Sequence, residues 1–215
     1  MIRDGYFLFD SDPEETTLEV AKRIGRPIKT PAMPLIQTLT PRIKENEYPN
    51  TYSGNFGLNE FPLHTDLAHW YIPPRYFLLR CVKPTSEVVT KILDHQQLLQ
   101  GESEEALSRS HFMPRKRLDR SANVLKIVNG ELFRWDSVFL KPVNRSAEAL
   151  KQRIEERIIS RAPESICLDK HGKCLLIDNW RVLHGRSAVG RNSMNRIVER
   201  VYLEELKLDS TKNGP

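Results

Sequence analysis

Two histidines and one aspartate have the residue types and the spacing needed to hold a metal ion. His64 and Asp66 stand two residues apart in FPLHTDLAHW, and His184 lies far downstream in IDNWRVLHGRS. Residues i and i+2 of a strand project from the same face, so this imidazole and carboxylate can converge on one ion. Two imidazoles and a carboxylate on one face of an octahedral ion leave three positions open, as in Fe(II) oxygenase sites. We therefore predict that His64, Asp66 and His184 are metal ligands and catalytic residues.

One further histidine is expected near the same ion. His69 follows the HTD segment closely, so it is expected to line the same cavity. The other three histidines are interpreted as ordinary structural residues in turn-like or basic contexts: His95, His111 and His171.

Two arginines near the end of the chain are candidates for binding an anion. Arg196 and Arg200 are four residues apart on an expected strand, so they share one of its faces. A buried guanidinium is costly without an anionic partner, and its shape suits two-point pairing with a carboxylate. The alternative is that both arginines pair at the surface with Glu199, Glu204 or Glu205.

The elements expected around these residues are mostly short strands broken by Pro, Gly and Asn. Strands are expected over 5–10, 75–82 and 196–203. Helices are expected over 12–24, 96–109 and 146–158, with Asp12 and Ser146 as N-caps. Hairpins are expected over 124–135, with a type I′ turn at Asn129-Gly130, and over 167–177, turning at His171-Gly172. His64 and Asp66 are expected on one strand, and His184 at a turn marked by Gly185.

This succession of elements predicts one domain over residues 1–215, mainly β with flanking helices (α+β). Many short antiparallel strands, with helices at the start and inserted later, favour a β-sandwich or jelly roll. The sequence has no βαβ alternation and no Gly-rich phosphate loop, so a nucleotide-binding fold is not expected.

Composition narrows the classes of partner. No apolar run approaches the roughly 20 residues that span a bilayer, and the N-terminus lacks a signal-peptide layout, so we expect a cytoplasmic protein without membrane contact. The three cysteines are interpreted as reduced thiols, although Cys167 and Cys174 would face each other across the second hairpin. The net charge of +5 is spread along the chain except around 115–120, which we interpret as a solvated basic cluster. No aromatic residues interleave with it, so no nucleic-acid partner is expected.

Six segments in a fixed order carry a resemblance to a known family: GYFLFDS, AKRIG, FPLHTD, PPRYFLLRCVKP, DNWRVLHGR and RIVERVYL. With an arginine twelve residues after the second histidine, the sequence resembles the taurine dioxygenase-like (TauD/TfdA) family of Fe(II)/2-oxoglutarate-dependent dioxygenases. The resemblance implies a clavaminate synthase-like double-stranded β-helix (jelly roll). It also implies Fe(II) as cofactor, 2-oxoglutarate as cosubstrate and dioxygen as oxidant.

The resemblance further assigns roles to single residues. Arg196 would hold the distal carboxylate of 2-oxoglutarate with Thr90 as its hydroxyl partner, although Val88-Val89 stand where the family usually has a Gly pair. Substrate contacts are expected from three residues: Arg200, Asn55 and His69.

The expected reaction is oxidation, in the simplest case hydroxylation, of a small polar molecule such as an amino acid or natural-product intermediate. 2-Oxoglutarate would be decarboxylated to succinate. Alternatives are a desaturase or cyclase with the same cofactors, a nucleic-acid demethylase, a zinc hydrolase using the same ligands, or a non-catalytic jelly-roll module for a small ligand. A homo-oligomer is compatible with the sequence.

Overall fold

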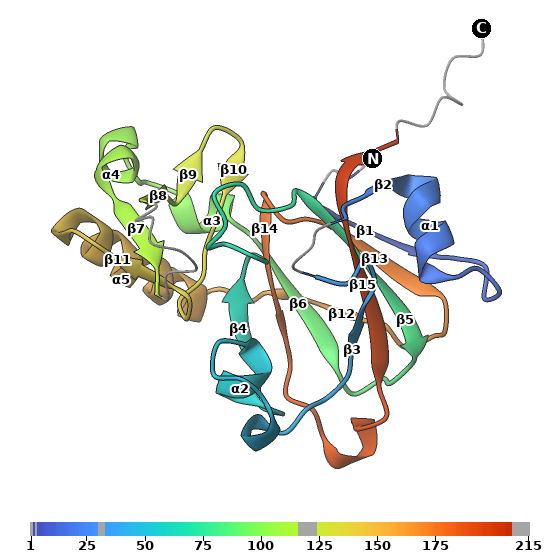
Figure 1. Ribbon diagram of the computed structural model, residues 1–215. Helices are drawn as coiled ribbons and strands as arrows, with labels where there is room; N and C mark the ends of the chain where they lie inside the picture. Colours follow the sequence, from blue (N-terminus) through green and yellow to red (C-terminus); the bar gives the residue numbers. More distant parts are fainter. Residues whose placement is uncertain (1, 3, 30–32, 116–123, 208–215) are drawn as a thin grey trace, which may run out of the picture.

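Two antiparallel sheets form the framework of the computed structural model, which describes residues 2, 4–29, 33–115 and 124–207 (Figure 1). The larger sheet has the order β1 (Tyr6–Asp10), β13 (Lys173–Asp178), β5 (Tyr76–Lys83), β15 (Ile197–Leu206) and β2 (Gly25–Pro27), with β3 (Gln37–Leu39) also paired to β15. The four-stranded sheet has the order β12 (Glu164–Cys167), β6 (Val89–Asp94), β14 (Val182–Arg186) and β4 (Phe61–His64). The basic cluster beyond Arg115 lies outside the described residues.

The two sheets face each other across one apolar cluster. Phe77 and Leu79 of β5 lie in that cluster with Ile92 of β6 and Val182 of β14. Because side chains alternate along a strand, Leu183 points to the opposite side of β14 and joins a separate cluster. His184 therefore returns to the inner face, between the sheets. Each fully buried aliphatic or aromatic side chain of this kind stabilises the fold by about 1.5–3 kcal/mol.

Helix α1 (Thr17–Ile24) covers the outer face of the larger sheet. Its Val20 and Ala21 are completely buried in a cluster with side chains of β5, β13 and β15. The helix begins later than the sequence pattern predicts, because Thr16 and Glu19 form a capping box: each side chain accepts from the other residue's backbone N–H. Asp12 instead forms a tight turn in which its carboxylate accepts from the N–H of Glu14.

The outer face of the four-stranded sheet is covered by an inserted region. It comprises α3 (Gln96–Leu99), α4 (Glu104–Arg109), α5 (Arg145–Ser160) and the small strands β7 (His111–Pro114), β8 (Leu125–Lys126), β9 (Val128–Asn129), β10 (Leu132–Phe133) and β11 (Leu140–Pro142). The helix predicted over 96–109 is broken, since Gly101 has a φ of +82° between α3 and α4. Asn144, not Ser146, caps α5 by accepting from the N–H of Ala147.

Both predicted hairpins need correction. At the first, Asn129 pairs with Leu132, so the turn residues are Gly130 and Glu131. Only Gly130 has a positive φ, which excludes a type I′ turn. The second hairpin does not exist: β12 pairs with β6 and β13 pairs with β1 and β5, so Cys167 and Cys174 belong to different sheets.

The remaining short elements are η1 (Lys44–Asn46), α2 (Tyr52–Phe56) and η2 (Arg191–Ser193), of which α2 lines the space between the sheets. No helix in the described part of the chain is long and apolar enough to cross a membrane. The prediction of a mainly β fold with flanking helices is confirmed.

Candidate metal centre

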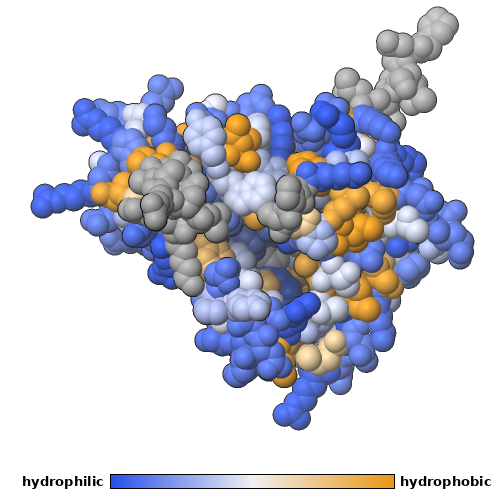
Figure 2. All heavy atoms as spheres, in the orientation of Figure 1, coloured by the Kyte–Doolittle hydropathy of each residue, from blue (hydrophilic) through white to orange (hydrophobic). Residues whose placement is uncertain are grey.

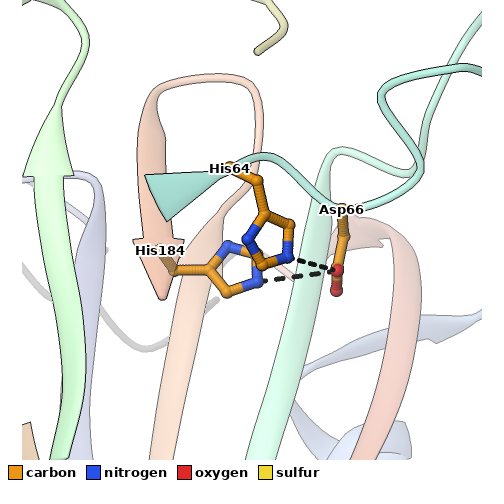
Figure 3. A group of neighbouring side chains, drawn as sticks. All are labelled: His64, Asp66 and His184. Atoms are coloured by element: carbon orange, nitrogen blue, oxygen red, sulfur yellow. Dashed lines mark ion pairs between the residues drawn. The ribbon is translucent and has the colours of Figure 1, made fainter. Parts of the chain in front are cut away.

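Pairing of β4 with β14 brings the two distant histidines together. His184 lies opposite His64 in the antiparallel ladder, and their ring centroids are 4.4 Å apart. One potential ligand atom each from His64, Asp66 and His184 lie within 4.8 Å of one another, and all three residues are buried. Figure 3 shows the two imidazoles and the carboxylate pointing toward one another from these segments.

The local backbone at these ligands differs from the sequence expectation in two places. Strand β4 ends at His64, so Asp66 lies beyond the strand. Gly185 is not a turn residue but continues β14, where a Cβ would lie 2.7 Å from the carbonyl oxygen of Phe61. Glycine at this position therefore permits the close approach of β4 and β14 that puts the histidines side by side.

Asn179, to which the sequence assigned no role, fixes the backbone of Asp66. Its side-chain oxygen accepts from the Asp66 N–H at 2.7 Å, and its amide donates to the Asp66 carbonyl at 3.0 Å. The same amide donates to Pro74 O at 2.9 Å. Asn179 is completely buried, so these bonds satisfy a side chain that would otherwise be costly to bury.

The imidazoles are oriented so that each Nε2 faces Asp66. His64 Nδ1 lies 2.8 Å from the carbonyl oxygen of Pro62, which accepts a hydrogen bond from Nδ1–H and leaves Nε2 free as a ligand. Tyr52 stacks on the His64 ring with centroids 4.0 Å apart, and Phe77 packs on His184 at 4.8 Å.

The three side chains fit a shared metal ion. Both Nε2 atoms lie 3.5 Å from Asp66 Oδ1. That separation is long for a hydrogen bond, whereas ligand atoms each about 2.1 Å from one ion lie about 3–3.5 Å apart. Two neutral imidazoles and one carboxylate suit a divalent transition metal.

Electrostatics hold His184 and Asp66 in the protonation states that a metal requires. Burial lowers the pKa of His184 to about 4, so its imidazole is neutral near pH 7. Burial alone would raise the pKa of Asp66, but the Arg200 charge and His184 outweigh it and hold that pKa well below its usual value. A neutral imidazole and an ionised carboxylate are the forms that bind cations.

A cavity of about 750 Å³ opens onto these ligands, and all eight predicted site residues line it. Figure 2 shows the surface hollowed near its centre, between the region of α2 and β4 and the region of β3 and β15. A volume of this size suits a small molecule together with a cosubstrate.

Arg196 lies in this cavity as an unpaired cation. It is 8% exposed, its Nε is buried without a hydrogen-bond partner, and its guanidinium makes no ion pair with the described residues. Burial lowers its pKa from the ordinary arginine value. Thr90 is also buried and lines the cavity from β6.

Arg200 also lines the cavity, but its guanidinium is already engaged. Its Nη1 donates to Asp66 Oδ2 at 2.5 Å, and its Nε and Nη2 donate to Gln37 Oε1 at 3.1 and 2.6 Å. Arg200 therefore does not form the alternative surface ion pairs considered from the sequence. Glu204 and Glu205 pair with Arg26 instead.

The remaining predicted residues lie further along the cavity wall. Asn55 donates to the carbonyls of Pro49 and Thr51 and so holds the loop before α2. His69 is half-buried, and burial lowers its pKa.

Asp136 is a cavity residue that the sequence analysis missed. It is 4% exposed, and its Oδ1 accepts from the N–H groups of Val138 and Phe139 at 2.7 and 2.8 Å. No described cation forms an ion pair with it, and burial raises its pKa. Its only signal in the sequence is its position directly after FRW, the end of the hairpin predicted over 124–135.

Comparisons with known proteins identify the fold. No protein-family model matches this sequence, and no curated protein sequence matches it. Among solved structures, asparagine oxygenase in complex with Fe(II), 2S,3S-3-hydroxyasparagine and succinate is similar, with a TM-score of 0.61 and 17% identity over 79% of this chain and 56% of that one. The non-heme iron oxygenase OrfP is similar with a TM-score of 0.67 and 17% identity over 94% of this chain and 77% of that one. A complex of OrfP with Fe and alpha-ketoglutaric acid gives a TM-score of 0.66 at 19% identity.

This chain therefore spans about 56% of the asparagine oxygenase chain. At these identities the similarity establishes a common architecture: the chain has the fold of non-heme iron oxygenases.

Proposed function

We propose that this chain is an Fe(II)/2-oxoglutarate-dependent dioxygenase that hydroxylates a C–H bond of a small polar molecule. One observation carries the proposal: the cavity that unites His64, Asp66 and His184 also contains the unpaired guanidinium of Arg196. The three ligands alone would also suit a zinc hydrolase. A buried cation beside them is accounted for by an anionic cosubstrate.

The fold supports this proposal. Two facing antiparallel sheets with a cavity between them are expected of a clavaminate synthase-like double-stranded β-helix, and OrfP, of similar fold, was solved with Fe and alpha-ketoglutaric acid. We treat residues 1–215 as one domain of this kind, related to the taurine dioxygenase-like enzymes. The cysteines are free thiols, which suits a reducing cytoplasm.

Each residue has a defined part in the proposed mechanism. His64 Nε2, Asp66 Oδ1 and His184 Nε2 would hold Fe(II). Fe(II), with 2-oxoglutarate and dioxygen, would supply the oxidising chemistry that inserts oxygen into a C–H bond while 2-oxoglutarate becomes succinate and carbon dioxide. Arg196 and Thr90 would bind the distal carboxylate of 2-oxoglutarate, and their burial strengthens that pairing by excluding water.

The substrate is proposed to carry a cationic group, as an amino acid does. Asp136 offers a buried carboxylate on the cavity wall that pairs with no cation in the described part of the chain. Asparagine oxygenase and OrfP were solved with hydroxyasparagine and hydroxy-L-arginine respectively. His69 and Asn55 would add polar groups to the lining of the same cavity, whereas the guanidinium of Arg200 is bonded to Asp66.

The decisive experiment is anaerobic addition of Fe(II) and 2-oxoglutarate to the protein, followed by visible spectroscopy. A weak charge-transfer band that is absent from His184→Ala is expected. A panel of amino acids is then screened for succinate release under air. Hydrolysis with zinc and no band would favour a hydrolase, and no metal binding would favour a ligand-binding module.

A further inference from the structure

The carboxylate of Asp66 is held at the oxygen that faces away from the histidines. Oδ2 accepts from Arg200 Nη1 at 2.5 Å and from the Tyr202 hydroxyl at 3.0 Å. Oδ1 is the atom that lies 3.5 Å from both imidazole Nε2 atoms. The two oxygens therefore have separate surroundings, one facing donors of β15 and the other facing the metal position.

Arg200 is itself fixed from a second side. Antiparallel pairing of β15 with β3 sets Arg200 opposite Gln37, whose Oε1 accepts from both Nε and Nη2. The guanidinium also lies 4.9 Å from the centroid of the Tyr202 ring. These contacts use three of the five N–H donors of the guanidinium, so two remain for another anion.

The number of oxygens through which Asp66 binds a metal decides how many coordination positions remain for other ligands. An octahedral ion has six positions, and a keto acid that chelates through two atoms plus dioxygen needs three of them. A carboxylate that bound through both oxygens would take a fourth position from these exogenous ligands. Donors that occupy Oδ2 favour binding through Oδ1 alone.

Building on the Fe(II) site described above, we propose that Arg200, together with Tyr202 and Gln37, is a positioning residue that presents Asp66 to the metal through one oxygen. Arg200 thereby keeps three coordination positions available, instead of serving as the main anchor for a substrate anion. Arg196, by contrast, has no ion pair with the described residues and can bind a carboxylate.

The test measures metal binding apart from turnover. Fe(II) affinity is measured by anaerobic equilibrium dialysis for the wild type, Arg200→Gln, Arg200→Lys, Tyr202→Phe and Gln37→Ala. We expect Arg200→Gln to weaken Fe(II) binding about 10- to 100-fold and the other three less, as for residues that orient a metal ligand. At saturating Fe(II), Arg200→Gln should also show a weakened charge-transfer band with 2-oxoglutarate, since Asp66 is then free to chelate.

Arg26→Gln is the matched control. Arg26 makes an exposed ion pair with Glu204, which lies near the end of β15, the strand that carries Arg200. It should bind Fe(II) like the wild type. Unchanged Fe(II) affinity and an unchanged band in Arg200→Gln, with only the substrate KM raised, would overturn the proposal in favour of a substrate anchor. If Arg200→Gln does not fold, unchanged Fe(II) affinity in both Tyr202→Phe and Gln37→Ala overturns it as well. A wild type that binds no Fe(II) refutes the oxygenase itself, which is a distinguishable result.

Discussion

Two parts of the same cavity differ in whether their charged side chains have partners: the metal corner, with Asp66 and Arg200, and the other corner, with Arg196. At the metal corner, the Asp66 N–H donates to Asn179, Asp66 Oδ2 accepts from Arg200 and Tyr202, and Arg200 also donates to Gln37. At the other corner, Arg196 is buried and forms no ion pair with the described residues. Under the proposed function, the contacts that hold the Asp66 carboxylate for a resident ion are already in place, whereas the group for a molecule that comes and goes is left unsatisfied at a cost to stability.

The largest effect is expected at the satisfied corner, from Asp66→Ala. Removal of the carboxylate should weaken Fe(II) binding more than 100-fold, roughly the loss of one ligand with its orienting contacts. It should also lower the free energy of unfolding by about 3 kcal/mol, because Arg200 is left without its anion. His64→Ala should lose Fe(II) equally but remain more stable. Equilibrium dialysis and urea unfolding measure both, with the exposed Asp10→Ala as control.

Matched substitutions at the two arginines test the contrast directly. Arg196→Gln should weaken 2-oxoglutarate binding about 10- to 100-fold while leaving the stability of the metal-free protein equal or higher, because a buried unpaired cation disappears. Arg200→Gln should instead destabilise the metal-free protein by about 2–3 kcal/mol. Titration with 2-oxoglutarate in the presence of Fe(II), and urea unfolding without metal, separate the two. A fall in stability of the same size for both variants would contradict the proposed difference between Arg196 and Arg200.

Arg196→Lys should also raise the apparent constant for 2-oxoglutarate, because an ammonium lacks the guanidinium fork.

The pH dependence of stability should reveal the neutral imidazole. The pKa of His184 is about 4 in the folded state against about 6.5 in an unfolded chain, so the unfolded state binds more protons between these values. The metal-free protein should therefore lose stability as the pH falls from about 6.5 to about 4, by roughly 2–3 kcal/mol from this group. Burial raises the pKa of Asp136, so this group should instead lower stability as the pH rises above about 4, the ordinary aspartate value in an unfolded chain. The difference between the wild type and His184→Asn isolates the histidine; parallel curves would contradict the assignment.

The smallest effect is expected from Thr90→Val, since Thr90 lines the same cavity as Arg196. This near-isosteric change removes one hydroxyl and should weaken 2-oxoglutarate binding about fivefold, near 1 kcal/mol, with Fe(II) affinity unchanged. Thr38→Val is a control, since Thr38 lines the same cavity from β3. Equal effects of the two substitutions would remove Thr90 from the proposed cosubstrate site.

Much of the framework was readable because it depends on local patterns. The apolar run from Arg75 to Val82 predicts β5, and the stripe at Leu150 and Ile154 predicts α5. Helix ends were less predictable: several residues near each start can act as caps, and Thr16 and Asn144 had the geometry to do so. The hairpin over 167–177 failed because a turn signal does not specify which sheet each arm joins.

The sequence by itself determined which residue types were present for chemistry: the pair His64 and Asp66, a distant His184 and an arginine twelve residues beyond it. Only the tertiary structure decided what Arg200 and Asp136 face and that Asn179 clamps Asp66. The physical reason is that a strand pattern fixes which face a side chain points to, whereas its partner depends on long-range pairing. Arg196 lies just before β15 and Arg200 lies within it, and both line the cavity, yet β3 supplies Gln37 only to Arg200.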